Sequence, residues 1–127
     1  MIAITSAPAG AILTAGFVIG GSTAKTVLIR AVGPTLGAAP FKIPGVMADP
    51  QLALFNSASV QIAGNDNWGG DAAISAANTA VGAFALGSAT SKDAIILVTL
   101  PPGAYTAQAS GVANTGGLAI VEVYEVP

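Results

Sequence analysis

The chain consists of short apolar runs rich in Val, Ile, Leu and Thr, separated by Gly, Pro, Asn and Ser. Runs of this length, bounded by turn-forming residues, are typical of β-strands. The pattern predicts seven strands, over residues 12–19, 26–32, 51–55, 59–63, 94–99, 104–110 and 118–125. Residues 1–5 can add an eighth strand at an edge of a sheet.

The clearest alternation lies in the stretch AYTAQAS, near the C-terminal end. Successive side chains of a strand point to opposite faces of the sheet, so a period of two separates a buried face from a solvated one. We therefore expect one set to face inward and the other to face solvent: Tyr105, Ala107 and Ala109 against Thr106, Gln108 and Ser110.

One segment departs from the strand pattern, the alanine-rich stretch GDAAISAANTAVGAF. Apolar and small residues recur in it at helical spacing from Ile74 to Val81. Asp71 is a good N-cap, and Gly82 is a good terminator. A short helix is expected over residues 72–81.

Together these elements predict an all-β fold, a two-sheet antiparallel β-sandwich of jelly-roll type. It would have seven or eight strands and one short helix near residues 72–81. No internal repeat is visible, so residues 1–127 form a single domain. Residues 1–10 are expected either to lie at a sheet edge or to be exchanged with a neighbouring copy.

The chain carries four basic and six acidic residues, and charged residues make up 8% of it, against about 25% in an ordinary soluble domain. A nucleic-acid partner would need a basic stripe, and none exists in this sequence. So sparse a charge is unusual for a protein surface exposed only to water, which favours self-association.

Catalytic groups are scarce, because the sequence has no histidine and no cysteine. Ser91 and Lys92 are adjacent, and adjacent side chains in a strand face oppositely, so they make a poor catalytic pair. The longest apolar run, residues 7–21, is shorter than the roughly 20 residues needed to span a bilayer. We expect neither an enzyme nor a membrane span.

The stretch GNDNWGGD gathers the oxygen-bearing side chains of Asn65, Asp66, Asn67 and Asp71 around Trp68. It does not fit the alternating ligand pattern of an EF-hand. The favoured interpretation is a structural turn in which Trp68 packs on the edge of the core. A looser calcium site at these four residues is the alternative, and no other cofactor is expected.

Arg30 lies in the apolar run TVLIRAV. An arginine buried alone is costly, so in such a strand it usually pairs with a carboxylate. Asp49 and Glu122 are both candidate partners, and this group is expected to be structural.

Several stretches resemble a β-rich module found in large secreted or surface proteins of environmental bacteria: KTVLIRAVGPTL, ADPQLALFN, IAGNDNW, SKDAIILVTLPPGAYTAQASG and AIVEVYEVP. LFN…IAGNDN and LPPGAYTAQASG are also similar to β-sandwiches of the pre-peptidase C-terminal type. The resemblance implies an extracellular or cell-surface location and a non-catalytic role. In some such modules the polar turn holds calcium, which would map here to Asp66 and its amide neighbours.

Two functional classes remain. The first is an extracellular structural subunit that associates with itself into an oligomer, fibre or surface assembly. The second is a surface module that binds glycan or another cell-surface component, with calcium as an aid. The low charge favours the first class.

Overall fold

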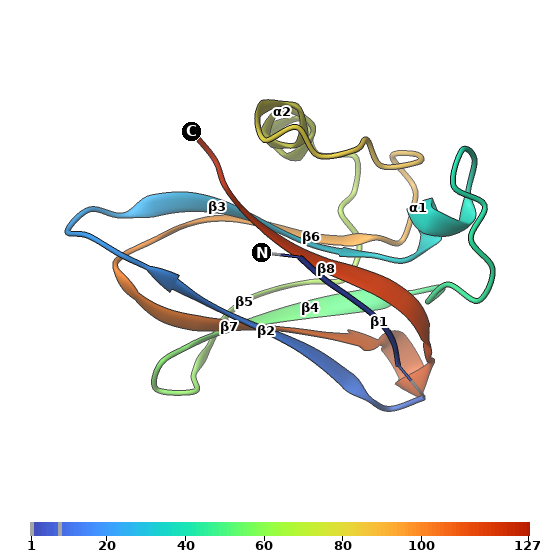
Figure 1. The fold of residues 1–127 in the computed structure, drawn as a ribbon, viewed down its shortest axis with the longest axis horizontal. Coiled ribbons are helices and arrows are strands. Elements are labelled where there is room, and N and C mark those ends of the chain that lie inside the picture. Colours follow the sequence, from blue (N-terminus) through green and yellow to red (C-terminus); the bar gives the residue numbers. More distant parts are fainter. Residues whose placement is uncertain (1, 8) are drawn as a thin grey trace.

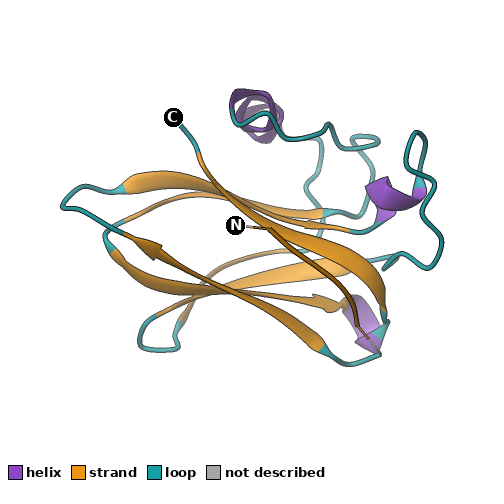
Figure 2. Cartoon of the chain, viewed as in Figure 1, coloured by secondary structure: helices purple, strands orange, loops and turns teal. Residues whose placement is uncertain are grey.

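A computed structural model describes the backbone of residues 2–7 and 9–127 and the side chains from residue 9 onward. Its eight strands are β1 (Ile2–Ala7), β2 (Ile12–Ile19), β3 (Lys25–Val32), β4 (Pro50–Asn56), β5 (Gln61–Asn65), β6 (Ala94–Leu100), β7 (Gly103–Gly111) and β8 (Gly117–Glu125). The helices are α1 (Pro34–Gly37), α2 (Ala72–Ala80) and a 3₁₀ turn (Val112–Asn114). The predicted all-β sandwich is confirmed (Figure 2).

The strands form two four-stranded sheets. Sheet A has the order β1-β8-β3-β6, and sheet B has the order β2-β7-β4-β5. Strand β1 pairs with β8, β2 with β7, β3 with β6 and β4 with β5, all antiparallel. The chain is thus one long hairpin that is folded over on itself. The β3–β8 and β4–β7 pairs join its strands into the two sheets. This is a jelly roll.

The main core lies between the two sheets, where the inward faces meet (Figure 1). In β7 the buried residues alternate with partly exposed ones, so Tyr105, Ala107 and Ala109 face inward as predicted. Strand β3 is different, because it is buried almost without interruption from Val27 to Val32. Both of its faces must therefore be covered.

The cover on the outer face of sheet A is the segment of residues 66–93, which includes α2 (Figure 1). Its side chains join those of the sheet in a second apolar cluster made of Leu28, Trp68, Ile74, Ala77 and Ile95. The molecule therefore has three layers: the α2 segment, sheet A and sheet B. We note that sheet B has no such cover among the described residues.

The structure shifts one predicted strand. Strand β5 begins at Gln61 instead of residue 59, because Ser59 adopts a left-handed φ of 60° within the preceding turn. The Asn56 side chain fixes that turn by accepting hydrogen bonds from the Ala58 and Val60 amides. The other predicted strands recur with small changes at their ends, and α1 and the 3₁₀ turn were not predicted.

Strand β1 lies at the edge of sheet A, where it pairs with β8 of its own chain. Residue 1 of the predicted edge strand lies outside the described residues. In the described part of the chain, none of the helices has the length and apolar character needed to cross a membrane.

Candidate functional site

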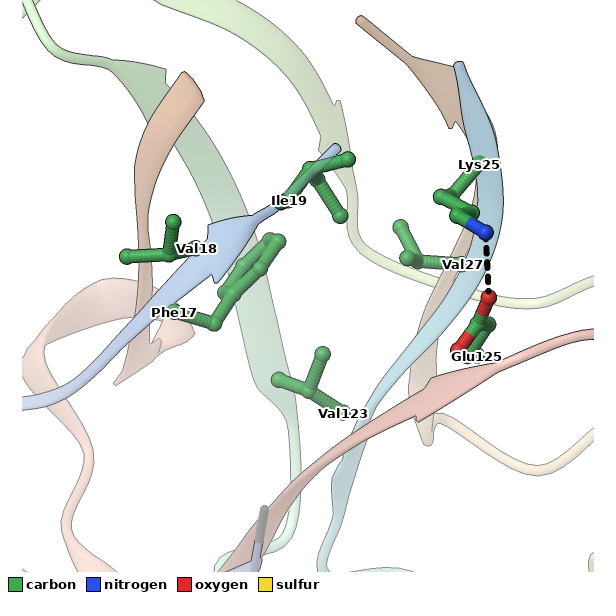
Figure 3. Close-up of a pocket in the computed structure, with 8 residues that line it drawn as sticks. Phe17, Val18, Ile19, Lys25, Val27, Val123 and Glu125 are labelled. Carbon is green, nitrogen blue, oxygen red and sulfur yellow. Dashed lines mark ion pairs between the residues drawn. The ribbon is translucent and has the colours of Figure 1, made fainter. Parts of the chain in front are cut away.

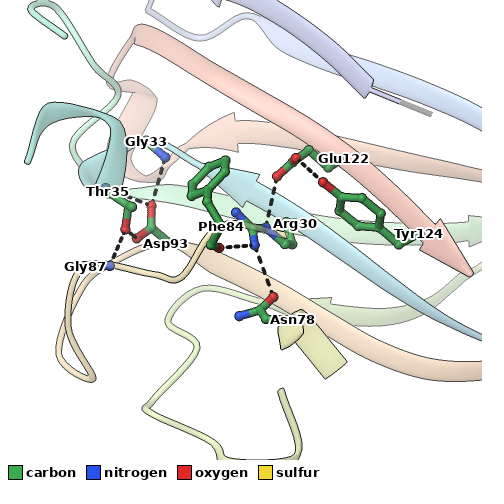
Figure 4. Close-up of polar contacts among 9 residues, drawn as sticks. All are labelled: Arg30, Gly33, Thr35, Asn78, Phe84, Gly87, Asp93, Glu122 and Tyr124. Atoms are coloured by element: carbon green, nitrogen blue, oxygen red, sulfur yellow. Dashed lines mark hydrogen bonds and ion pairs between the residues drawn. The ribbon is translucent and has the colours of Figure 1, made fainter. Parts of the chain in front are cut away.

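Arg30 lies in β3 and points to the face of sheet A that the α2 segment covers (Figure 4). Its side chain is fully buried. The Arg30 Nε lies 3.0 Å from an oxygen of Glu122. One terminal nitrogen donates hydrogen bonds to the Asn78 side-chain oxygen at 3.1 Å and to the Phe84 carbonyl at 2.8 Å. The guanidinium thus ties β3 to β8, to α2 and to the loop that follows α2.

Two aromatic residues also contact this ion pair. The Phe84 ring lies over the guanidinium, 4.3 Å from ring centroid to carbon, an arrangement that favours a cation. The Tyr124 hydroxyl donates to Glu122 (Figure 4). Burial, together with this hydrogen bond and the charge of Glu122, raises the pKa of Tyr124 to about 12. Of the two candidate carboxylates, Glu122 is the ion-pair partner of Arg30, and Asp49 lies beside Asp66 instead.

A second buried carboxylate, that of Asp93, was not singled out from the sequence. It accepts hydrogen bonds from the Gly33 amide at 2.9 Å and from both the amide and the hydroxyl of Thr35 (Figure 4). The Ser91 hydroxyl adds another at 2.7 Å. This carboxylate fixes the chain between β3 and α1 against the start of β6. Ser91 therefore has a structural role.

The GNDNWGGD stretch caps the free edge of β6. The Asn65 side-chain oxygen accepts from the Ile95 amide at 2.9 Å, and the Trp68 amide donates to the Asp93 carbonyl at 3.1 Å. The Trp68 ring is buried, and its nitrogen donates to Ser91 and to the Ser88 carbonyl.

The Asp71 carboxylate and the Asn65 nitrogen also make hydrogen bonds, whereas Asn67 contributes its main-chain carbonyl. Asp71 is the N-cap of α2, and its carboxylate accepts from the Ala73 and Ile74 amides. The Asn65 amide nitrogen donates to the Asn67 carbonyl. This stretch acts as a joint between β5, α2 and β6.

The Asp66 carboxyl lies beside that of Asp49, which precedes β4. Partial burial and then the neighbouring Asp66 carboxyl raise the pKa of Asp49, while Lys92 opposes the rise. One Asp49 oxygen is buried without a hydrogen-bond partner. In the described part of the chain, no group of three acidic residues is arranged to hold a metal ion. Calcium normally takes six to eight oxygens, and this pair supplies only part of such a shell.

The outer face of sheet B lacks the charged groups that form the networks around Arg30 and Asp93. Strands β2, β4, β5 and β7 contain no charged residue. The outward side chains are small, neutral or apolar: Ile12, Thr14, Val18, Gln51, Ala53, Phe55, Ile62, Ala104, Thr106, Gln108 and Ser110. A shallow groove of about 230 Å³ crosses this face between Ile12, Ala53 and Gln61.

A small apolar pocket of about 170 Å³ opens between the sheets at the end of β2 (Figure 3). Phe17, Ile19, Val27 and Val123 contribute its apolar wall. An ion pair between Lys25 of β3 and Glu125, 3.4 Å apart, lies at its rim (Figure 3). The pocket therefore borders the exposed edge of sheet B.

Most of the aromatic side chains that a sugar-binding face would use are occupied internally, and Phe55 is half-buried on the outer face of sheet B. Trp68 and Tyr105 are buried, and the Tyr105 hydroxyl donates to the Pro101 carbonyl at 2.7 Å. Tyr124 is bonded to Glu122. Among the described aromatic residues Phe41 is the exposed one, and its ring packs edge-on against Phe84.

No family model matches the sequence, and no curated protein matches it either. Among solved structures, the chain is similar to the pre-peptidase C-terminal domain of a collagenase from Bacillus anthracis. The TM-score is 0.58 at 12% sequence identity, over 98% of this chain and 88% of that one. At this identity the likeness shows the fold alone, and it agrees with the sequence resemblance to β-sandwiches of that type.

Proposed function

We propose that this chain is a non-catalytic structural subunit that associates with copies of itself outside the cytoplasm. The observation that supports it best is the asymmetry of the two sheets. The α2 segment covers the outer face of sheet A, whereas the outer face of sheet B is uncharged and uncovered among the described residues. A partner copy is the simplest cover for such a face.

The location of the charges strengthens this proposal. The chain has ten charged side chains, four basic and six acidic. Three of them, Arg30, Asp93 and Glu122, are buried, so seven remain for 6007 Å² of surface. That leaves roughly one charge per 860 Å², far fewer than a free monomer usually displays. All seven lie in sheet A or in connecting segments. Repulsion between charges would therefore not oppose contact through sheet B.

The buried polar groups support a non-catalytic role, because they bond to one another and hold the fold together. The Asp93 carboxylate accepts hydrogen bonds from the Ser91 hydroxyl and from the Gly33 amide. Arg30 forms an ion pair with Glu122. The extracytoplasmic location rests on the resemblance to secreted modules and on the likeness to a domain of a collagenase.

The test is the mass of the native particle in solution, measured by light scattering over a range of concentrations. We expect a multiple of the 12.3 kDa chain mass. A particle that stays at 12.3 kDa at high concentration would refute self-association.

A second function, recognition of a neutral glycan, is favoured by one observation. The groove on sheet B is lined by the amide and hydroxyl groups of Gln51, Gln61, Gln108 and Ser110, which suit sugar hydroxyls. The buried aromatic residues place this function second. Binding of neutral polysaccharide that is lost in Gln108→Ala, by a chain that remains monomeric, would favour it over self-association.

A further inference from the structure

We infer that two copies join edge to edge through β2, around a two-fold axis at Ala15, so that sheet B runs continuously through both copies. This inference rests on the proposed self-association and names one contact for it, the β2 edge of sheet B, which is separate from the outer face of that sheet.

Strand β2 is an unprotected edge strand. It is the end strand of sheet B and, among the described strands, is paired with β7 alone. Its eight residues, ILTAGFVI, include no charge and no proline, the devices that usually guard a sheet edge. The edge of β6 is different, because Asn65 and Trp68 cap its first half.

Two hydrogen bonds fix which main-chain groups of β2 point outward. The amide and carbonyl of one residue point to the same side of a strand, and this side alternates along the chain. The Asn56 amide bonds to Val60 on the β5 side, so the even residues of β4 face β5 and the odd ones face β7. Odd residues of β4 lie opposite even residues of β7, and the bond from the Val112 amide to the Asp49 carbonyl agrees with this, so the odd residues of β7 face β2. By the β2–β7 register, the odd residues of β2 then face β7.

The outward main-chain groups of β2 therefore belong to its even residues: Ile12, Thr14, Gly16 and Val18. These residues also carry the side chains of the outer face. No hydrogen bond of their outward groups is found among the described residues. An antiparallel partner strand would satisfy them, with each opposed pair exchanging two hydrogen bonds.

The side chains select the register. Val18 is 74% exposed and Ile12 is 57% exposed, the highest values among the large apolar side chains described. A two-fold axis at Ala15 places Ile12 opposite the partner's Val18, and Val18 opposite the partner's Ile12. It also places Thr14 opposite the partner's Gly16, which avoids crowding. The two-fold symmetry forms the Ile12–Val18 pair twice, so both exposed apolar side chains of each copy are covered.

The neighbouring register covers less. A two-fold axis at Gly16 would set Val18 against the partner's Thr14 and leave Ile12 beyond the paired strand. On the inner face, the axis at Ala15 brings the partner's Leu13 against Phe17, which lines the pocket beside this edge (Figure 3). The Ala15 axis therefore fits both faces of the strand.

A charge at this edge tests the contact. Val18→Lys should reduce the particle mass by half or more, because a lysine opposite the partner's Ile12 would lose its hydration at the contact, whereas it stays solvated in the monomer. Val60→Lys is the matched control, since Val60 is 54% exposed but precedes β5 at the opposite edge. We expect Val60→Lys to leave the mass unchanged.

Cross-linking tests the register. The chain has no cysteine, so single-cysteine variants report on one position each. Opposed residues of a hydrogen-bonded pair lie about 5.5 Å apart between Cα atoms, within disulfide range. Equivalent Ile12 residues of the two copies would lie roughly 20 Å apart or more. Mixing Ile12→Cys with Val18→Cys should therefore give disulfide-linked dimers on mild oxidation, and neither variant alone should.

The outcomes separate the two proposals. Dimers cross-linked only in the mixture, together with loss of mass in Val18→Lys, support the β2 contact. An oligomer that survives Val18→Lys and gives no cross-link in the mixture overturns the β2 contact while self-association stands. A 12.3 kDa monomer for the unmodified chain overturns both.

Discussion

Arg30, Asp93 and Glu122 are charged side chains buried in a chain that carries few charges. Burying an ion costs several kcal/mol unless a counter-charge and hydrogen bonds replace the lost water. Arg30 has both, and Asp93 has hydrogen bonds from backbone amides and hydroxyls. These groups join the α2 segment to sheet A, so they stabilise the covered side of the sandwich.

Glu122→Gln should lower the free energy of unfolding by about 3–5 kcal/mol, because it leaves the Arg30 charge buried without a counter-charge. Urea denaturation would measure this. Glu125→Gln is the matched control, since its ion pair with Lys25 is exposed, and such pairs contribute about 0–1 kcal/mol. Equal effects of the two substitutions would contradict the account of the buried pair.

Asp49→Asn should raise the melting temperature at pH 7. The pKa of Asp49 is raised in the folded protein, chiefly by burial and then by Asp66. Ionisation of Asp49 therefore costs more in the folded than in the unfolded chain, and stability falls as pH rises through the raised pKa. The substitution should remove that fall. Melting curves from pH 3 to pH 7 would show it, and a variant less stable than the parent at pH 7 would refute it.

At the scale of elements, the 65–71 segment joins three of them, because it ends β5, caps the edge of β6 and starts α2. Asp71→Ala should lower the free energy of unfolding by about 1 kcal/mol through loss of the helix cap. Chemical denaturation measures the change, and Ser75→Ala, on the exposed side of α2, serves as the control. No measurable loss would show that the cap does not stabilise α2.

Calcium should leave the melting temperature almost unchanged, since only a ligand that binds the native state raises it. The side-chain oxygens of Asn65 and Asp71 accept hydrogen bonds from backbone amides, and the Asp66 carboxyl lies beside that of Asp49. A rise of several degrees in millimolar calcium, abolished in Asp66→Ala, would establish a metal site instead.

Most elements could be predicted from the sequence because periodicity and turn residues are local signals. Strand β2 and the start of α2 at residue 72 appear where the pattern places them. The start of β5 was misplaced, since the apolar Val60 looks like a strand residue but closes a turn held by Asn56. Local composition does not report such a turn.

The polar networks were harder to predict because they depend on register. Arg30 and Glu122 lie directly opposite each other in the β3–β8 pair, and only the register distinguishes Glu122 from Asp49. Asp93 draws its partners from residues 33 and 35, far away in the sequence. The edge cap by Asn65 also depends on the proximity of β5 and β6, which no spacing in the chain reveals.

At the scale of the whole molecule, the sandwich has one covered and one uncovered outer face among the described residues. The α2 segment completes the outer face of sheet A, and sheet B ends in the unguarded strand β2 and an uncharged face. A second copy can supply what the uncovered side lacks without bringing like charges together, since sheet B carries none.

The measurement that tests this account most directly is light scattering of the unmodified chain from micromolar to millimolar concentration. We predict particles whose mass is a multiple of 12.3 kDa, with the dimer as the smallest abundant species. A single species of 12.3 kDa throughout that range would contradict the account.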